Sequence, residues 1–114
     1  MEVTYRFFDT SKDDPERLFG LFAATYGDAE PLKRRWVWQY IEHPRSTGIR
    51  IMIAEHRKRL VASTTRMPSD VMIGGRRVSC SFGCDSMVAP EYRRLGIMNQ
   101  LYKNCTGFTK LAFG

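Results

Sequence analysis

The sequence predicts an α/β (α+β) fold in which helices pack on a mainly antiparallel sheet. Three observations lead to it: amphipathic runs at helical spacing, shorter runs rich in β-forming residues, and a two-residue hairpin signal between two of those runs. The expected order is one strand, two helices, three strands, one helix and a final strand. No repeat and no long linker interrupts this order, so we expect a single domain over residues 1–114.

The composition excludes several classes of protein. Of the 114 residues, 43% are apolar and 12% aromatic, which argues against a disordered chain. No apolar run approaches the roughly 20 residues of a membrane-spanning helix, and Met1–Arg6 lacks the layout of a signal peptide. We therefore expect a soluble, cytoplasmic protein without a membrane partner.

The first strand and the first helix are expected before Gly27. Val3–Phe8 is rich in β-forming residues and predicts the strand. Asp14 is suited to cap a helix whose first position is Pro15, and Gly27 is suited to end it. The apolar residues between them recur at helical spacing: Leu18, Phe19, Phe22 and Tyr26.

A second helix is expected over Leu32–Ile41. It should end before His43–Pro44, because proline disfavours helical backbone in the residue that precedes it. Helical spacing predicts two of its three aromatic residues in the core rather than in an acceptor site: Trp36, Trp38 and Tyr40. Three strands follow, the first two being Ile49–Glu55 and Leu60–Met67 on either side of a basic turn.

The third of these strands is expected over Ser79–Val88, after a hairpin signal at Gly74–Gly75 that is flanked by Val71–Ile73 and Arg76–Val78. Alternation assigns its side chains to two faces. One face would carry Cys80, Phe82, Cys84, Ser86 and Val88, and the other Ser81, Gly83, Asp85 and Met87. The spacing of the cysteines does not match a zinc site, so we interpret Cys80, Cys84 and Cys105 as buried and reduced and expect no metal.

The charge of the chain favours an anionic partner. Eighteen Lys and Arg against twelve Asp and Glu give a net charge of +6. The excess lies in four clusters: Lys33–Arg35, Arg57–Arg59, Arg76–Arg77 and Arg93–Arg94. The first three are interpreted equally well as solvated turns and helix ends. The fourth differs because of its neighbours.

Asp85–Ile97 is the segment that carries chemistry. A strand runs into a short loop with Arg93, Arg94 and Gly96, and the loop opens a helix whose stripe is Ile97, Met98, Leu101, Tyr102 and Cys105. The first amides of a helix have no internal partner and lie at its positive end, where they can hold a phosphate. Gly96 leaves room for a bulky anion, and the arginines add donors. We predict a pyrophosphate cradle at Arg94–Met98, the alternative being an ordinary helix start.

These residues resemble a family. Val88–Ile97 (Val-Ala-Pro-Glu-Tyr-Arg-Arg-Leu-Gly-Ile) is similar to the acetyl-CoA-binding motif of the GNAT superfamily of N-acetyltransferases, Arg/Gln-x-x-Gly-x-Gly/Ala after a strand. The order of elements matches the N-terminal half of that fold, in which helices cover both faces of the sheet. Trp36–Tyr40 with His43–Pro44 is similar to a segment of some bacterial members. Met98 departs from the motif, and its helical spacing suggests that it points into the core.

The resemblance implies a function in acetyl transfer from acetyl-CoA to an amine that the sequence does not identify. The pyrophosphate would be held by the amides of Arg94, Leu95, Gly96, Ile97 and Met98, and the pantetheine arm would lie along Ser86, Met87 and Val88. A backbone N–H near Met87 or Val88 would polarise the thioester carbonyl. Asp85 would act as a base or position the amine. Its alternative is a structural or loop-capping carboxylate.

The resemblance also implies further C-terminal elements. The chain ends at Gly114, in a strand expected over Phe108–Phe113, so we expect the C-terminal part of the usual fold to be absent here. This leaves two alternatives from other classes. One is a non-catalytic half-domain that forms a homodimer or assembles through its open sheet edge. The other is a basic module that binds nucleic acid, which the dispersed basic residues disfavour.

Overall fold

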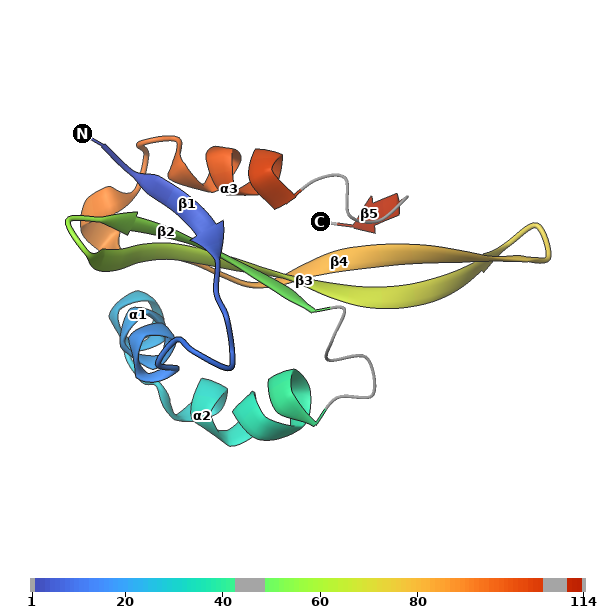
Figure 1. Ribbon diagram of the computed structural model, residues 1–114, viewed down its shortest axis with the longest axis horizontal. Coiled ribbons are helices and arrows are strands. Elements are labelled where there is room, and N and C mark those ends of the chain that lie inside the picture. The colour runs from blue at the N-terminus through green and yellow to red at the C-terminus, as the bar shows by residue number, and fades with distance from the viewer. Residues whose placement is uncertain (1, 43–48, 106–110, 114) are drawn as a thin grey trace.

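The computed structural model describes residues 2–42, 49–105 and 111–113. They form one five-stranded sheet in the order β1-β2-β3-β4-β5, with α1 and α2 on one face and α3 on the other (Figure 1). Strands β1 to β4 pair antiparallel, and β5 pairs parallel to β4. The predicted fold, with helices on both faces of a mainly antiparallel sheet, is therefore confirmed.

The elements follow the predicted order. They are β1 (Thr4–Phe7), α1 (Glu16–Tyr26), α2 (Glu30–Trp36), the π-helix η1 (Val37–Ile41), β2 (Arg50–His56), β3 (Arg59–Ile73), β4 (Arg76–Val88), the 3-10 helix η3 (Pro90–Tyr92), α3 (Ile97–Cys105) and β5 (Leu111–Phe113). The expected helix stop at His43–Pro44 lies outside the described residues.

Helix α1 begins one residue later than the capping signal indicated. Pro15 occupies the N-cap position, and the carboxylate of Asp14 accepts a hydrogen bond from the amide of Glu16 at 2.9 Å. The helix ends at Gly27, whose φ of 89° suits glycine and whose amide donates to Ala23 at 2.7 Å. Asp14 therefore starts the helix as a turn residue rather than as its cap.

The second predicted helix is a short α-helix that continues as a π-turn. Helix α2 starts at Glu30, and η1 follows it over Val37–Ile41. Trp36 and Tyr40 are buried with their rings stacked at 4.8 Å, whereas Trp38 is 59% exposed. The expectation that two of the three aromatic residues lie in the core is confirmed.

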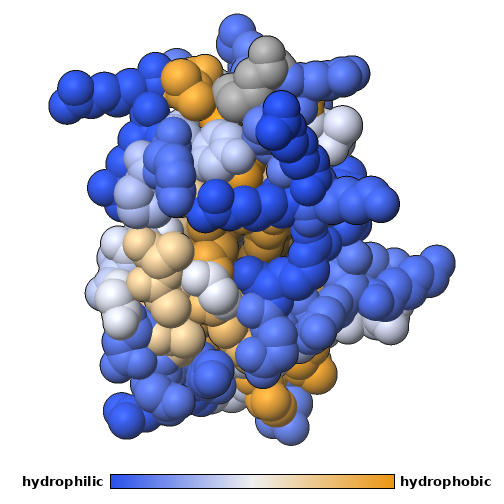
Figure 2. Space-filling view, turned by 90° about the vertical axis from the view of Figure 1, so that its left-hand side faces the viewer, coloured by the Kyte–Doolittle hydropathy of each residue, from blue (hydrophilic) through white to orange (hydrophobic). Residues whose placement is uncertain are grey.

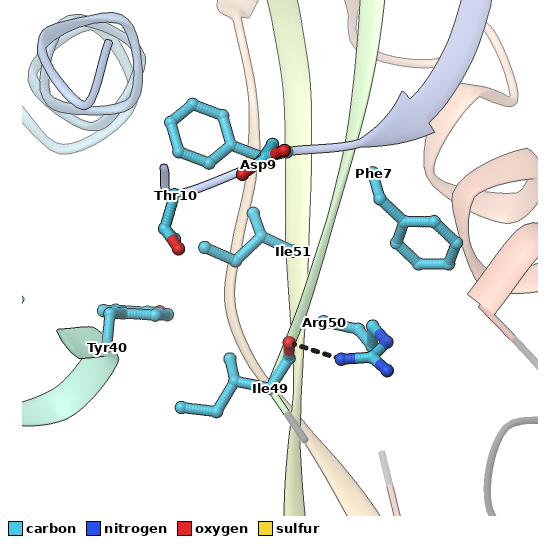
Figure 3. Close-up of a pocket in the computed structure, with 8 residues that line it drawn as sticks. Phe7, Asp9, Thr10, Tyr40, Ile49, Arg50 and Ile51 are labelled. Atoms are coloured by element: carbon cyan, nitrogen blue, oxygen red, sulfur yellow. Dashed lines mark hydrogen bonds between the residues drawn. The ribbon is translucent and has the colours of Figure 1, made fainter. Parts of the chain in front are cut away.

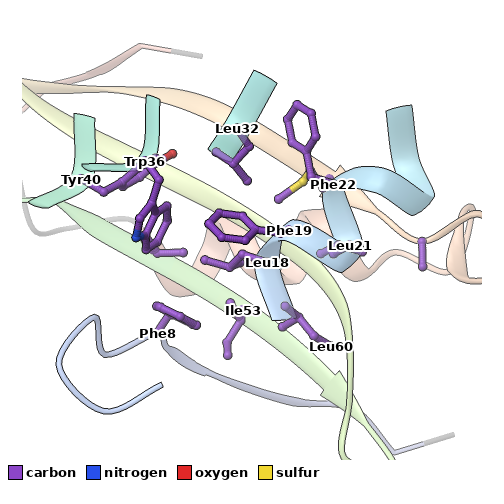
Figure 4. Packing of buried hydrophobic residues seen from close by; sticks show 13 residues of the cluster. Phe8, Leu18, Phe19, Leu21, Phe22, Leu32, Trp36, Tyr40, Ile53 and Leu60 are labelled. Atoms are coloured by element: carbon purple, nitrogen blue, oxygen red, sulfur yellow. The ribbon is translucent and has the colours of Figure 1, made fainter. Parts of the chain in front are cut away.

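Two apolar clusters hold the layers together. Residues of α1, α2 and η1 pack under the sheet with Phe8, Ile51, Ile53, Leu60 and Met87 (Figure 4). On the other face, Ile97 and Leu101 of α3 pack on Met52, Ala54, Val61 and Ala62. Because helices pack on both of its faces, the sheet is held between two layers.

Strands β3 and β4 form a long hairpin. Gly74 and Gly75 connect them with φ values of 57° and 79°, the backbone of a type I′ turn, as the sequence predicted. The short runs at Val71–Ile73 and Arg76–Val78 are the distal parts of these strands, which reach beyond the helices in Figure 1.

A bulge in β4 lies where this hairpin enters the body of the protein. Ser63 pairs with Met87 and Thr65 with Cys84, so Asp85 and Ser86 both stand opposite Thr64. Asp85 has a φ of 50°, which is rare for a residue with a side chain.

The bulge shifts the alternation of side chains along β4. The side chains of Cys84 and Asp85 both reach Gln39 of η1, whereas Ser86 contacts Tyr102 of α3 on the other face. The predicted grouping of Cys84 with Ser86 and Val88 is therefore wrong, because an extra residue interrupts the two-residue period of the strand.

An ion-pair network ties β1 to the loop before α1. The guanidinium of Arg6 donates to Asp13 at 2.9 and 3.0 Å and to Glu55 of β2 at 2.7 Å. Donation from Arg6, and then from the amide of Asp9, lowers the pKa of Asp13 from 3.8 to about 2. The carboxylate of Asp13 is therefore held in its charged form by the fold.

Asp13→Asn should reduce the dependence of stability on pH in acid. A carboxyl whose folded pKa is lowered stabilises the fold above its unfolded pKa near 3.8, and this contribution is lost as pH falls toward 2. Urea unfolding at pH 7, 4 and 2.5 should show a smaller loss of stability for Asp13→Asn than for the wild type. Asp28→Asn serves as a surface control, and equal losses for wild type and Asp13→Asn would contradict the prediction.

Candidate functional site

The loop between β4 and α3 is open to solvent. Arg94 and Gly96 adopt left-handed backbone conformations with φ values of 66° and 75°, and α3 begins at the next residue, Ile97. A Cβ built on Gly96 meets no heavy atom within 4 Å. The loop therefore presents its backbone toward solvent, without a side chain at Gly96 to cover it.

The amides at the start of α3 lack partners. The amide of Gln100 donates to the carbonyl of Gly96 at 3.2 Å. Within the described ranges of the chain, the amides of residues 94–99 donate no hydrogen bond to another protein group. Arg93 and Arg94 are exposed beside them. Amides and guanidinium groups together form a place where an anion can bind.

Met98 does not fill this place. It is partly buried and packs against the cluster of Ile97 and Leu101 beneath α3. The interpretation that its side chain points into the core is confirmed, so the departure from the motif at Met98 leaves the loop open.

One edge of β4 is unpaired near the loop. The amide of Ala89 donates to the carbonyl of Val61 in β3 at 2.8 Å. Because backbone groups of a strand alternate between its two neighbours, the N–H of Val88 points to the opposite edge. On that edge β5 pairs only with Cys80–Phe82, so among the described residues Gly83–Val88 has no neighbouring strand there.

The carboxylate of Asp85 is the centre of a polar cluster under the bulge. Arg35 of α2 binds both of its oxygens at 2.7 Å. The hydroxyl of Tyr40 donates to the same carboxylate, and Gln39 donates to it at 3.4 Å. The side chains of Arg35 and Asp85 are 25% and 11% exposed, so this ion pair is largely shielded from water.

The cluster raises the pKa values of Arg35, Tyr40 and Cys84. Hydrogen bonding to Asp85 raises the pKa of Arg35. Burial, followed by the charge of Asp85, raises the pKa of Tyr40 and brings the pKa of Cys84 to about 11. At neutral pH, Arg35 is thus charged and Tyr40 and Cys84 keep their protons. Cys84 is therefore a protonated thiol with little nucleophilic character.

The other groups of the bulge are bonded as well. The carbonyl of Ser86 accepts a hydrogen bond from the hydroxyl of Tyr26 in α1 at 2.9 Å. The hydroxyl of Ser86 lies 2.9 Å from that of Thr64 and 3.4 Å from that of Tyr102. Helices on both faces of the sheet thus hold the bulge in place.

A hollow of about 440 Å³ lies on the η1 side of the sheet (Figure 3). Tyr40 contributes to its wall, together with Ile49 and Ile51, and Arg50 donates to the carbonyl of Ile49 at 3.2 Å. Among the described residues, Tyr40 lines this hollow and also binds Asp85.

The structure brings the predicted site residues into two groups. Ser86, Met87 and Val88 lead into the loop of Arg93 to Met98, while the carboxylate of Asp85 binds residues of α2 and η1. Sequence reasoning missed the partners of Asp85, which are Arg35, Gln39 and Tyr40. Their only signal is the four-residue spacing of Arg35 and Gln39, which places both on one helix face.

Two negative findings concern the described residues alone. No three His, Cys, Asp or Glu side chains among them lie close enough together to hold a metal ion. Among the same residues, every helix is too short or too polar to cross a membrane.

Comparison with known proteins identifies relatives in fold. The chain matches the family model described as an acetyltransferase (GNAT) domain over residues 6–107. A GCN5-related N-acetyltransferase from Kribbella flavida is 24% identical, with a TM-score of 0.69 over 89% of this chain and 26% of that protein. This chain thus spans about a quarter of the length of the Kribbella protein. No curated protein matches the chain.

Two further solved structures cover more of their own chains. The aminoglycoside acetyltransferase HMB0005, from an uncultured soil metagenomic sample, is 14% identical, with a TM-score of 0.74 over 99% of this chain and 78% of that one. AAC(6')-Iy, in complex with the bisubstrate analog CoA-S-monomethyl-acetylneamine, is also 14% identical, with a TM-score of 0.66 over 91% and 69%. Because the family model covers residues 6–107, nearly the whole chain, the protein belongs to the GNAT acetyltransferase family.

Proposed function

We propose that the chain binds acetyl-CoA and forms the coenzyme-binding part of an N-acetyltransferase. The observation that carries this proposal is the loop before α3, where the amides of residues 94–99 lack acceptors among the described residues. A pyrophosphate would supply the missing acceptors, and Arg93 and Arg94 would add charge-assisted donors. Membership of the GNAT family, and the coenzyme A analog bound by AAC(6')-Iy, support this choice of anion.

The unpaired edge of β4 supports a place for the pantetheine arm. The amide groups of the pantetheine arm can pair with Gly83–Val88 as an added strand would, since β5 leaves this edge free within the described residues. Of the two amides that the sequence offered for the thioester carbonyl, Val88 is favoured over Met87. The N–H of Val88 points to the open edge, whereas alternation directs that of Met87 to β3.

Acetyl transfer requires little covalent chemistry from the protein. A neutral amine attacks the thioester carbonyl carbon, a C–N bond forms, and the C–S bond breaks. The attacking amine loses one proton before and one after the attack, and the leaving thiolate takes up one of them. The amide of Val88 would stabilise the negative charge on the carbonyl oxygen during the attack.

We assign Asp85 a positioning role in this reaction. Both carboxylate oxygens are already bound by Arg35, and Tyr40 and Gln39 donate to one of them, so a proton taken from an amine would disrupt a largely shielded ion pair. The cluster instead holds the bulge that precedes Val88. Asp85 would therefore act through the geometry of β4.

The open edge of β4 also supports a second candidate, a homodimer in which each chain adds a strand to the other. Acetyl-CoA and a second chain would then compete for the same edge. Light scattering of the purified chain should give a dimer that acetyl-CoA dissociates if this candidate holds. A monomer in both conditions would reject it.

Gly96→Asp should abolish binding of acetyl-CoA, while Gly96→Asn should retain it. Asp and Asn have the same size and both tolerate a φ near 75°, so the pair differs only in a negative charge against the pyrophosphate. Calorimetric titration at several salt concentrations measures this. Equal affinities for the two variants would remove the loop from the proposed site, and absence of binding by the wild type would reject the proposal itself.

Asp85→Asn should lower the rate of acetyl transfer by roughly 10²-fold, since small displacements of reacting groups have effects of that size. The affinity for acetyl-CoA should fall less than the rate, because the loop that would hold the pyrophosphate is separate from the cluster. Rates are measured on a panel of primary amines, with Glu42→Gln as a surface control. A positioning role predicts an unchanged shape of the pH–rate profile at a lower level. Loss of the acidic limb would instead identify Asp85 as the base.

A further inference from the structure

The turn between β2 and β3 lies at the same end of the molecule as the loop before α3 (Figure 1). Contacts with η3 fix it there. Arg59 is paired with Glu91 at 3.2 Å, and its guanidinium lies 5.5 Å from the centre of the Tyr92 ring. His56 Nδ1 lies 2.8 Å from the hydroxyl of Tyr92. The turn and the start of the loop therefore form one connected surface.

Arg57 and Lys58 at the tip of this turn form no ion pair within the described part of the chain, although Glu2 and Glu55 line a hollow with them. Both cations are exposed. Their neighbours differ, because Arg17 pairs with Glu55 at 2.7 Å and Arg59 with Glu91. The unpaired charge at this end of the sheet is thus carried by the turn, in addition to the two arginines of the loop.

The backbone of the turn does not favour these two residues. Arg57 and Lys58 have φ values of 53° and 64°, so the turn has the two left-handed residues of a type I′ hairpin. Asn-Gly is the preferred pair in such a turn, because a side chain makes a left-handed backbone less stable. Folding alone does not explain two long cationic side chains at this place, whereas binding of an anion does.

A hollow of about 260 Å³ adjoins the turn on the side of α1. Its lining includes three apolar residues, Leu21, Ala24 and Leu60, and three basic ones, Arg17, Lys58 and Arg59. Figure 2, which looks onto this end of the molecule, shows apolar residues in a strip between hydrophilic side chains. A lining of apolar side chains with cations beside them suits a flat ring that carries a phosphate.

We infer that the turn between β2 and β3 is a second anion-binding element, in which Arg57 and Lys58 bind the 3′-phosphate of coenzyme A. This inference rests on the proposed function of the loop. Coenzyme A carries two separate anionic groups, a pyrophosphate and a phosphate on the ribose of its adenosine. Two separate cationic elements at one end of the protein match them in number and in charge, the loop holding the first and the turn the second.

The test compares coenzyme A with dephospho-coenzyme A, which lacks only the 3′-phosphate. The variant Arg57→Asn/Lys58→Gly removes both cations and leaves a pair that the turn prefers, so the fold should be retained. Its control, Arg76→Thr/Arg77→Thr, removes the same charge from strand positions beside the turn between β3 and β4. That turn lies at the opposite end of the 47 Å molecule.

Calorimetric titration near 0.15 M salt should show a preference of the wild type for coenzyme A. The turn variant should weaken the binding of coenzyme A by roughly five- to tenfold, the size expected of one charge-assisted contact, and leave dephospho-coenzyme A within about twofold. The control variant should keep the preference of the wild type.

Three other results would overturn the inference. Equal binding of both ligands by the wild type would mean that the 3′-phosphate touches no cation. An equal loss of both ligands in the turn variant would reduce Arg57 and Lys58 to a general positive field. Binding of neither ligand by the wild type would reject the coenzyme site itself, and the inference with it.

Discussion

The bulge in β4 is the constraint on which the site depends. It places one extra residue opposite Thr64, turns Asp85 toward α2, and sets the direction in which the last residues of the strand point. A left-handed conformation at a non-glycine residue persists only when its surroundings hold it. Here the ion pair between Arg35 of α2 and Asp85 stabilises this conformation, and so does the hydrogen bond from Tyr26 of α1 to the carbonyl of Ser86. Removal of one partner would leave a shielded charge unpaired, which is more costly than the pair is stabilising.

The local features of this fold were predictable from sequence, and its long-range contacts were not. The hairpin at Gly74–Gly75 and the stripe of α1 follow from residue type and spacing within a few positions. Alternation also predicted that Asp85 and Ser86 face opposite ways, although it misplaced Cys84. The pair of Arg35 with Asp85 joins residues 50 positions apart, and a basic cluster on a helix gives no sign of it. The bulge is equally hidden, because no glycine marks its left-handed residue.

The end of β4 contributes to the core and also to the open edge of the sheet, because successive residues of a strand direct their groups to alternate sides. Met87 directs its side chain into the core beneath α1, and the amide of its neighbour Val88 faces the unpaired edge. The chain then crosses to the other face through η3, so that α3 can pack on β2 and β3. This crossing brings the free amides of the loop to the same end as the turn between β2 and β3. A free edge and a set of free amides thus arise from one strand and the connection that follows it.

The positively charged residues of the protein fall into two groups, those that pair with carboxylates and those that do not. Three arginines pair with carboxylates of the sheet or of a neighbouring loop: Arg6, Arg17 and Arg35. These ion pairs stabilise the fold, and the paired charges attract a ligand only weakly. The arginines of the loop and the cations at the tip of the turn lack such partners among the described residues, and they lie at one end of the molecule. A net charge of +6 is therefore a poor guide to the partner, while the distribution of unpaired cations is a good one. Two compact groups at one end suit a small ligand with two anionic centres better than the extended backbone of a nucleic acid.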